Sequence, residues 1–375
     1  MLYEIHMIKN YPPTNLNRDE TGSPKSCYFG GTQRGRISSQ CLKHSWRTSP
    51  LFSDLLGEIG IRTRKLPELV SMELRKRGVD EALISVAEKK VSGIANKDGK
   101  ENNDRMTSQI VFYSAADVSS ITDLMEKCAS DAGDVKGFEK MKATDIIKQI
   151  KDAKLRPITM DVALFGRMVT SDAFADVEAA VQTAHAISTH AVNQESDYFT
   201  AVDDMISLGG SEDAGAAMIG DTDFNSCCYY HYMAIDTDIL EANLRYSPEA
   251  KALVAEVLPA MLQVMAYSDP SGKQNSFAGH VLPDMLCVEV KKRKIPVSYA
   301  NAFAEPVRFS GQQKLVSESV KKLIAEIDTM DQAYGLEVVH RGWFSPRTPG
   351  LTPKKSEIAE NFGALLEACA GWARA

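Results

Sequence analysis

Residues 15–47 read NLNRDETGSPKSCYFGGTQRGRISSQCLKHSWR, and this stretch sets the charge and local structure of the N-terminal region. From Lys25 to Arg47 it holds five Lys or Arg and no Asp or Glu, in a chain of formal net charge −7. Its glycines predict turns, and Ser38-Ser39 predicts the start of a helix. Backbone amides and cations in this arrangement suit a bound polyanion.

Charge is distributed unevenly along the rest of the chain. Residues 1–47 carry seven Lys or Arg against three Asp or Glu, whereas residues 168–244 carry fourteen Asp or Glu and no Lys or Arg. One part of the molecule can therefore attract a polyanion that another part repels. The same asymmetry suits head-to-tail contact between copies of the chain.

Length and composition indicate an ordinary globular protein. The 375 residues predict two or three compact units, with 44% hydrophobic and 25% charged residues. We find no signal peptide pattern and no run of about 18 apolar residues, so we expect a cytoplasmic protein without a membrane partner. The seven cysteines have irregular spacing and no C-x-x-C pair, which predicts reduced thiols.

Hydrophobic periodicity and turn residues divide the chain into elements. The predicted strands are 2–9, which we interpret as half-buried, and 157–164, 224–235, 280–290 and 295–299. The predicted helices are 39–48, 66–77, 80–92, 113–131, 139–152, 176–189, 236–245, 249–267, 314–334 and 356–373. We expect a long loop over 10–37 and an acidic protruding loop or hairpin from Ala191 to Asp223. Strands and helices interleave without regular βαβ spacing, which favours an α+β fold.

The glycines Gly30 and Gly35 have the spacing of half a phosphate-binding loop. Arg36-Ile37 stand where a nucleotide-binding loop needs Lys and then Ser or Thr, so ATPase chemistry is excluded. A solvated helix face is the simpler interpretation of any single cation here, but the whole cluster favours a nucleic-acid surface. That cluster comprises Arg18, Lys25, Arg34, Arg36, Lys43 and Arg47.

For the other candidate functional residues, a purely structural interpretation is stronger than a catalytic or ligand-binding one. His185 and His190 do not share a helix face, and no Cys/His set has the spacing of zinc ligands. Asp203-Asp204 and the Asp221/Asp223 pair lie in an acidic segment, where solvation explains them better than a metal does. Tyr229, Tyr230 and Tyr232 fit core packing at least as well as base stacking. We expect no metal, no cofactor and no catalytic residue.

Several long motifs in order give the chain a family resemblance. LNRDETGSPKSCYFGGTQRGRISSQCLKHSWR, DVALFGRMVTSDAFADVEAAVQTAHAISTH, DYFTAVDD, FNSCCYYHYMAIDTDIL and KIPVSYANAFAEPV closely resemble the CasC family. CasC proteins are the repeated backbone subunits that bind CRISPR RNA in the type I-E CRISPR Cascade complex. The resemblance covers essentially residues 1–310.

The resemblance implies an α+β fold shaped like a right hand. A modified RNA-recognition-motif (RRM-like, ferredoxin-like) palm carries a helical fingers insertion and a thumb hairpin. The implied parts are palm over 1–60, 157–190 and 224–350, fingers over 61–156, thumb over 191–223, and a C-terminal helix over 351–375.

The resemblance also assigns residues of this chain to roles. The RNA-binding set joins Ser38 and Gln40 to the cations named above, which are Arg18, Lys25, Arg34, Arg36, Lys43 and Arg47. The wedge and thumb set, beside a displaced nucleotide, is Arg167, Met168, Tyr198, Phe199 and Thr200. Tyr198 stands where the family can carry Trp, and Thr32 occupies a position that can be basic.

Three function classes follow. The first is a non-catalytic scaffold that presents CRISPR RNA to a target DNA strand and displaces about every sixth nucleotide. Its partners would be neighbouring copies and subunits of the CasA, CasB, CasD and CasE types. The second is a type III-like backbone subunit that cuts target RNA with a metal and a loop aspartate, Asp19 or Asp203. The third is a homo-oligomeric structural protein without nucleic acid.

Overall fold

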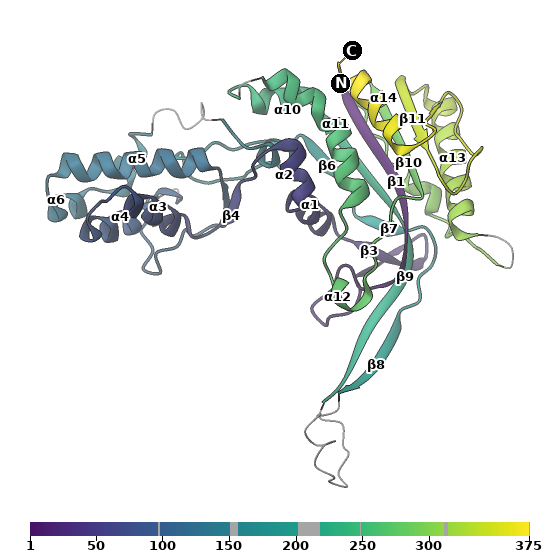
Figure 1. Cartoon of the computed structure of the whole chain (residues 1–375), viewed down its shortest axis with the longest axis horizontal. Coiled ribbons are helices and arrows are strands. Elements are labelled where there is room, and N and C mark those ends of the chain that lie inside the picture. The colour runs from purple at the N-terminus through teal and green to yellow at the C-terminus, as the bar shows by residue number, and fades with distance from the viewer. Residues whose placement is uncertain (97, 151–156, 202–217, 248, 311–313, 375) are drawn as a thin grey trace, which may run out of the picture. The chain divides into compact units, whose positions relative to one another are not determined.

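The computed structural model describes residues 1–96, 98–150, 157–201, 218–247, 249–310 and 314–374 (Figure 1). Contacts divide the chain into two compact units. The first comprises Met1–Phe52, Gln182–Ala234 and Glu256–Ala375, and the second comprises Ser53–Val181 and Ile235–Ala255. A large sheet flanked by helices and a separate helical group confirm the predicted α+β class.

The sheet of the first unit follows the order β12-β11-β10-β1-β9-β7-β3-β2, and β6 and β8 also pair with β9. Figure 1 shows the long strand β1 beside β10 and the β8–β9 ribbon extending from the sheet. The strands are β1 (Leu2–Thr14), β2 (Ser26–Phe29), β3 (Thr32–Ile37), β6 (Val181–Thr183), β7 (Ala186–Ser188), β8 (Glu195–Ala201), β9 (Met218–Asp236), β10 (Met285–Lys291), β11 (Val338–Phe344) and β12 (Glu357–Ile358).

Helices cover both faces of this sheet. They are α1 (Ser39–Arg47), α12 (Gln274–Phe277), η2 (Ala300–Phe303), α13 (Leu315–Tyr334) and α14 (Phe362–Arg374). Two further helices cross the boundary between the units, α2 (Pro50–Leu56) and α11 (Ala250–Tyr267).

Strand β1 is buried on both faces, so the prediction of a half-buried strand is wrong. Leu2 and Ile8 pack in one core with residues of α13. On the opposite face Lys9 donates to the carbonyl of Ala266 in α11 over 3.0 Å. Side chains alternate along a strand, so two helical layers bury both sets of β1 residues.

Helix α11 is long and apolar enough, by length and composition, to cross a membrane, with a mean hydropathy of 1.3 over 18 residues. The expectation that no such run exists is therefore wrong. Half of that window is buried within the structure, and the contact with Lys9 places its C-terminal end against the sheet.

The second unit is mainly helical. Its elements are β4 (Ile61–Thr63), α3 (Leu66–Lys76), α4 (Glu81–Ile94), β5 (Val111–Tyr113), α5 (Ala115–Ala132), α6 (Val135–Lys140), α7 (Ala143–Ile147), α8 (Met160–Phe165) and α10 (Thr237–Leu244). Its core includes Leu66, Ile84 and Ile121. This unit contains the predicted helical insertion 61–156, of which 97 and 151–156 lie outside the described residues. It also contains the segment 157–181, which the resemblance gave to the palm.

The long helices are where pattern and structure agree best. Helices predicted at 39–48, 66–77, 80–92, 236–245, 249–267 and 314–334 are α1, α3, α4, α10, α11 and α13, within two residues at each end. The last predicted helix begins six residues late, at Phe362, because β12 first pairs in parallel with β11. Buried Tyr229, Tyr230 and Tyr232 confirm the core interpretation of the tyrosines, and all seven cysteines are free thiols.

The predicted loop over 10–37 is wrong, because β1 continues to Thr14 and β2 and β3 form a hairpin. Gly30 and Gly31 form its turn with φ angles of 60° and 79°. Two successive residues with positive φ match the twist of a two-residue hairpin, and glycine adopts them without strain. The Gly-Gly pair was the available sequence signal.

Three further predicted elements are wrong. Residues 176–189 form β6 and β7 instead of a helix, since β7 pairs with β3 and β9. Residues 157–164 were predicted as a strand, but Met160–Phe165 form the short helix α8. Residues 295–299 form no strand, because Pro296 has no N–H and the Val297 amide donates to Glu4 Oε1 over 2.8 Å.

Candidate nucleic-acid interface

Helix α1 begins with a capped turn and carries a polar stripe. Ser38 is the N-cap, and its hydroxyl accepts from the Cys41 amide over 3.3 Å. Leu42 and Trp46 are buried on another face of the helix. Gln40, Lys43 and Arg47 follow one another at spacings of three and four residues, so they share one face of the helix. Ser38 therefore serves the helix end, while the three long side chains form a line.

The charge state of Lys43 depends on its half-buried position. Burial lowers the pKa of its ammonium group. A phosphate beside the group would oppose that effect, because an anion stabilises the charged form.

Asn17 joins the preceding loop to the start of α1. Its carbonyl accepts from the Lys25 amide over 2.8 Å, and its side-chain Oδ1 accepts from the Ser38 amide over 2.9 Å. Arg18 forms an isolated bridge with Pro24 in the same loop. Arg18, Lys25 and the N-cap of α1 are thus held in one frame. Sequence reasoning missed Asn17, whose only signal was its place in a polar loop.

A second group of cations surrounds His185. Arg36 Nε donates to the Ser26 carbonyl over 3.2 Å, and its Nη1 lies 3.0 Å from His185 Nδ1. Burial, and then the charges of Arg36 and Lys25, lower the pKa of His185. A neutral imidazole can accept from Arg36 and hold its guanidinium in place. Arg36 therefore stays a candidate RNA-binding residue. His185 is a positioning residue for its guanidinium.

The structure removes Arg34 from the predicted RNA-binding set. Its side chain is fully buried. Nη1 donates to the Ser188 carbonyl over 3.0 Å, Nη2 donates to the Phe303 carbonyl over 2.8 Å, and Nε donates to Thr32 Oγ1 over 2.8 Å. These bonds use the guanidinium to join the hairpin to the sheet and η2. Alternation along β3 gives Arg34 and Arg36 the same face, so the burial of Arg34 comes from its contacts with β7 and η2, which its charge alone did not reveal.

Arg167 is likewise internal, in the second unit. Its Nη1 pairs with Asp117 Oδ2 over 2.8 Å, and its Nε donates to the Ala175 carbonyl over 3.1 Å. Both members of the ion pair are buried. The prediction that Arg167 meets a nucleotide is therefore wrong in this conformation. The next residue, Met168, is 87% exposed, so Arg167 fixes the turn that displays it.

The exposed ribbon, defined as β8 with Met218–Phe224 of β9, carries apolar side chains on both faces. Phe199 pairs with Gly220, and a Cβ on Gly220 would lie 2.6 Å from the Phe199 ring. The ring therefore lies across the glycine. Tyr198, which is 65% exposed, projects to the opposite face together with Thr200 and its partner Ile219. Residues 202–217, including Asp203, lie outside the described residues.

Asp19 has a local structural use. Its Oδ1 accepts from the Thr21 amide over 2.9 Å, from the Thr21 hydroxyl over 2.7 Å and from the Ser23 amide over 3.1 Å. These bonds lower the pKa of the carboxyl group. Within the part of the chain that the structure describes, no group of three or more His, Cys, Asp or Glu side chains could hold a metal ion.

A groove of about 480 Å³ lies beside the loop and α1 in the first unit. Its lining includes Arg18, Asp19, Glu20, Cys41 and His44, and the loop at Gly272 lies along it. A Cβ on Gly272 would lie 2.4 Å from the Leu16 carbonyl oxygen, so only glycine permits this close approach.

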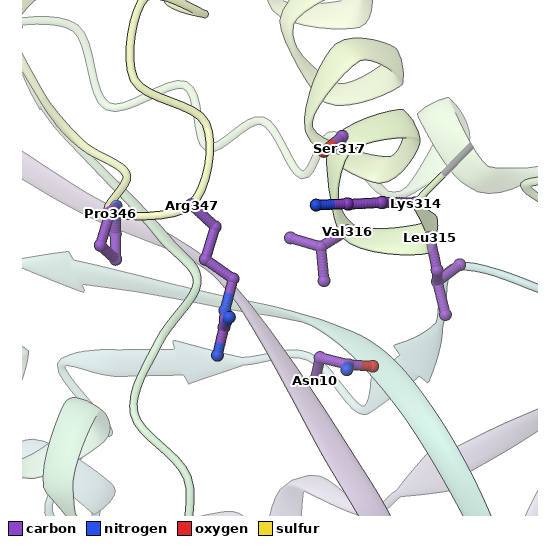
Figure 2. A pocket seen from close by; sticks show the side chains of 7 residues that line it. All are labelled: Asn10, Lys314, Leu315, Val316, Ser317, Pro346 and Arg347. Atoms are coloured by element: carbon purple, nitrogen blue, oxygen red, sulfur yellow. The ribbon is translucent and has the colours of Figure 1, made fainter. Parts of the chain in front are cut away.

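A further hollow, with two cations in its lining, lies on the α13 side of the sheet. Figure 2 shows Lys314 and the next three residues of α13 on one side, Arg347 on the other and Asn10 below. The hollow has a volume of about 470 Å³. Arg347 Nε pairs with Asp284 Oδ1, which leaves Lys314 as the less compensated cation. Sequence reasoning missed both residues, since each is an isolated cation in the chain.

The fold and these cations define a class, an RRM-like α+β protein with a basic loop and helix. The chain belongs to the family of CT1975-like proteins, whose sequence model matches residues 3–370. A search of curated proteins finds no match.

Two solved structures are similar to the chain over its whole length. One, titled "CRISPR RNA-guided surveillance complex, pre-nicking", shares 26% identity at a TM-score of 0.85 and covers 100% of both chains. Another, titled "CRISPR RNA-guided surveillance complex", shares 23% identity at a TM-score of 0.73 and covers 99% of this chain and 100% of that one. The second likeness shows the fold alone.

Proposed function

We propose that the chain is a non-catalytic backbone subunit of a type I-E CRISPR surveillance complex in the cytoplasm. Several copies bind one CRISPR RNA and present it for pairing with target DNA. The observation that carries the proposal is the frame around Asn17, which aligns Arg18, Lys25 and the stripe of α1. The family and the surveillance-complex structures that resemble the chain support it.

The stripe of α1 matches the needs of a sugar–phosphate backbone. Gln40, Lys43 and Arg47 extend over about 10 Å of helix, from the rise of 1.5 Å per residue. Contacts of this kind hold a strand in register without reading its bases. The subunit would therefore accept any guide sequence and leave the base edges available for pairing.

The two exposed apolar groups supply the wedge of this proposal. Lifting a base from its stack costs a few kcal/mol, and an apolar side chain can replace part of the lost contact. Met168 of the second unit provides a thioether and Phe199 of the first unit provides a ring, and each can meet a displaced base about once every six nucleotides. Arg167 acts as a positioning residue for Met168, through Asp117.

The proposed partners are neighbouring copies, the target DNA strand and subunits of the CasA, CasB, CasD and CasE types. Absence of catalysis is also part of the proposal. The role of Asp19 in its loop supports the absence of catalysis, because its carboxylate accepts three hydrogen bonds from Thr21 and Ser23.

Purification of the assembled complex tests the binding role. The absorbance ratio at 260 and 280 nm should show nucleic acid, which ribonuclease reduces and deoxyribonuclease does not. Native mass spectrometry should then show several copies of the chain on one RNA. A stable protein oligomer free of RNA would contradict the proposal and favour the purely structural class.

A separate assay tests the absence of catalysis. The guide-loaded complex is incubated with labelled complementary RNA and Mg²⁺. We expect intact target RNA. Products at a six-nucleotide period would overturn the scaffold role and support the metal-dependent alternative.

A further inference from the structure

Four consecutive cations, Lys291 to Lys294, begin at the last residue of strand β10. The first is buried, and its ammonium group pairs with Glu289 over 3.0 Å and with Glu4. The other three are exposed, since the strand ends at Lys291 and the chain leaves the sheet. We call Lys292–Lys294 the basic corner. The RNA-binding set predicted from the sequence does not include the basic corner.

Little negative charge offsets the basic corner along the chain. No Asp or Glu occurs between Val290 and Ala304. Arg293 pairs with Glu337 over 3.1 Å, and both side chains are more than half exposed. An exposed pair of this kind contributes at most about 1 kcal/mol, so a stronger anion can take the guanidinium.

The register of the sheet separates the basic corner from the basic loop and α1. Leu2 of β1 lies opposite Lys291, whereas the loop that carries Arg18 begins after Thr14 at the other end of β1. Thirteen residues of strand, at a rise of about 3.3 Å each, place these ends about 40 Å apart. The basic corner and the loop that carries Arg18 therefore lie at opposite ends of β1.

We propose that the basic corner is a second polyanion site, which binds the phosphate backbone of a nucleic-acid strand other than the one held by α1. Adjacent, exposed and flexible cations match the regular negative charges of a phosphate chain. The alternative ligand is the acidic surface of another protein, and such an interface ordinarily also needs an apolar core on the basic corner. Ile295, 51% exposed, is the one large apolar side chain within the next three residues.

The test compares Lys292→Gln/Arg293→Gln with Lys76→Gln/Lys321→Gln in the guide-loaded complex. The control removes the same charge from two other exposed lysines that form surface ion pairs. The probe is a fluorescent DNA duplex without complementarity to the guide, titrated between about 50 and 200 mM salt. Loss of two phosphate contacts should reduce the log K against log salt slope by about 1.8, which changes the salt sensitivity about twelvefold over that range.

Guide content is measured in the same samples, so failure of this site and failure of the proposed function are distinguishable. We expect unchanged guide content in both variants and a changed slope only in the first. An unchanged slope, or a change in particle size without a change in DNA binding, would overturn the proposal. The second outcome would assign the corner to contact between copies. Ultraviolet cross-linking of the unmutated complex to the duplex gives a second measurement, and DNA must attach within residues 292–295.

Discussion

The basic loop–helix of residues 15–47 and the exposed ribbon of β8 and β9 are held in contrasting ways. The first is tied to the sheet by the buried guanidinium of Arg34, and Asn17 joins its loop to the start of α1. All seven residues of β8 are exposed, and its partner strand supplies its ladder of contacts. The comparison teaches that the proposed phosphate contacts lie on a frame fixed by side-chain bonds, whereas the ribbon beyond its base at Asp223 and Phe224 is held by strand pairing.

Acid should have the largest effect, because the sheet beneath the loop–helix contains buried neutral histidines. Burial lowers the pKa of His6 and His231 to about 3 and that of His190 to about 4. The unfolded chain gains protons below about pH 6.5 and the folded chain does not, so stability falls as the pH decreases towards 4. Each histidine contributes up to about 1.4 kcal/mol per pH unit. Urea denaturation at pH 7, 6 and 5 measures this loss.

His231→Leu provides the matched variant, because neither ring nitrogen of His231 has a hydrogen-bond partner in the described structure. The variant should lose stability less steeply with acid than the unmutated chain does. Parallel curves for the variant and the unmutated protein would contradict the assignment.

Arg34→Gln should destabilise the first unit by about 3 kcal/mol, because it leaves buried carbonyls without their donor. Arg36→Gln, two residues away, should cost less than about 1 kcal/mol, since its side chain is partly solvated. Chemical denaturation measures both. Equal losses would mean that the two arginines share one role, and the distinction between anchor and surface cation would fail.

Lys43→Ala/Arg47→Ala should weaken guide binding with little dependence on sequence. Each lost phosphate contact should flatten the log K against log salt slope by about 0.7 for single-stranded RNA. Filter binding between low and moderate salt measures it, with Lys76→Ala/Lys321→Ala as the charge control. A slope equal to that of the unmutated protein would exclude these two residues as phosphate contacts.

Asn17→Ala should cost about 1 kcal/mol of stability, through loss of the bond from the Ser38 amide. Guide affinity should fall while the salt slope stays constant, because no cation is removed. This pattern separates a positioning residue from a contact residue. A changed slope would instead show that the loop has lost Arg18 or Lys25 as contacts.

Phe199→Ala and Met168→Ala should have the smallest effect on stability, within about 0.5 kcal/mol, because both side chains are exposed. Guide content should remain normal. Permanganate reactivity of thymines at the interrupted positions of the target strand should decrease. Gly220→Ala is a companion variant, since its methyl group would displace the Phe199 ring. Unchanged reactivity in all three would contradict the wedge.

Sequence by itself determined the α+β class, the long helices and the polar stripe of α1. Periodicity and capping act within a few residues, so Ser38, Lys43 and Arg47 could be placed from the chain alone. The resemblance added Met168 and Phe199, and both side chains are exposed as a wedge requires.

Only the tertiary structure decided which cations face solvent. Arg34 and Arg36 have the same charge and lie on one strand, yet distant carbonyls on β7 and η2 bind the first, and a histidine meets the second. Strands β6 and β7 were likewise missed, since pairing with residues far along the chain overrode local helical periodicity. Contacts between remote segments select burial and partners, and no local pattern encodes those choices.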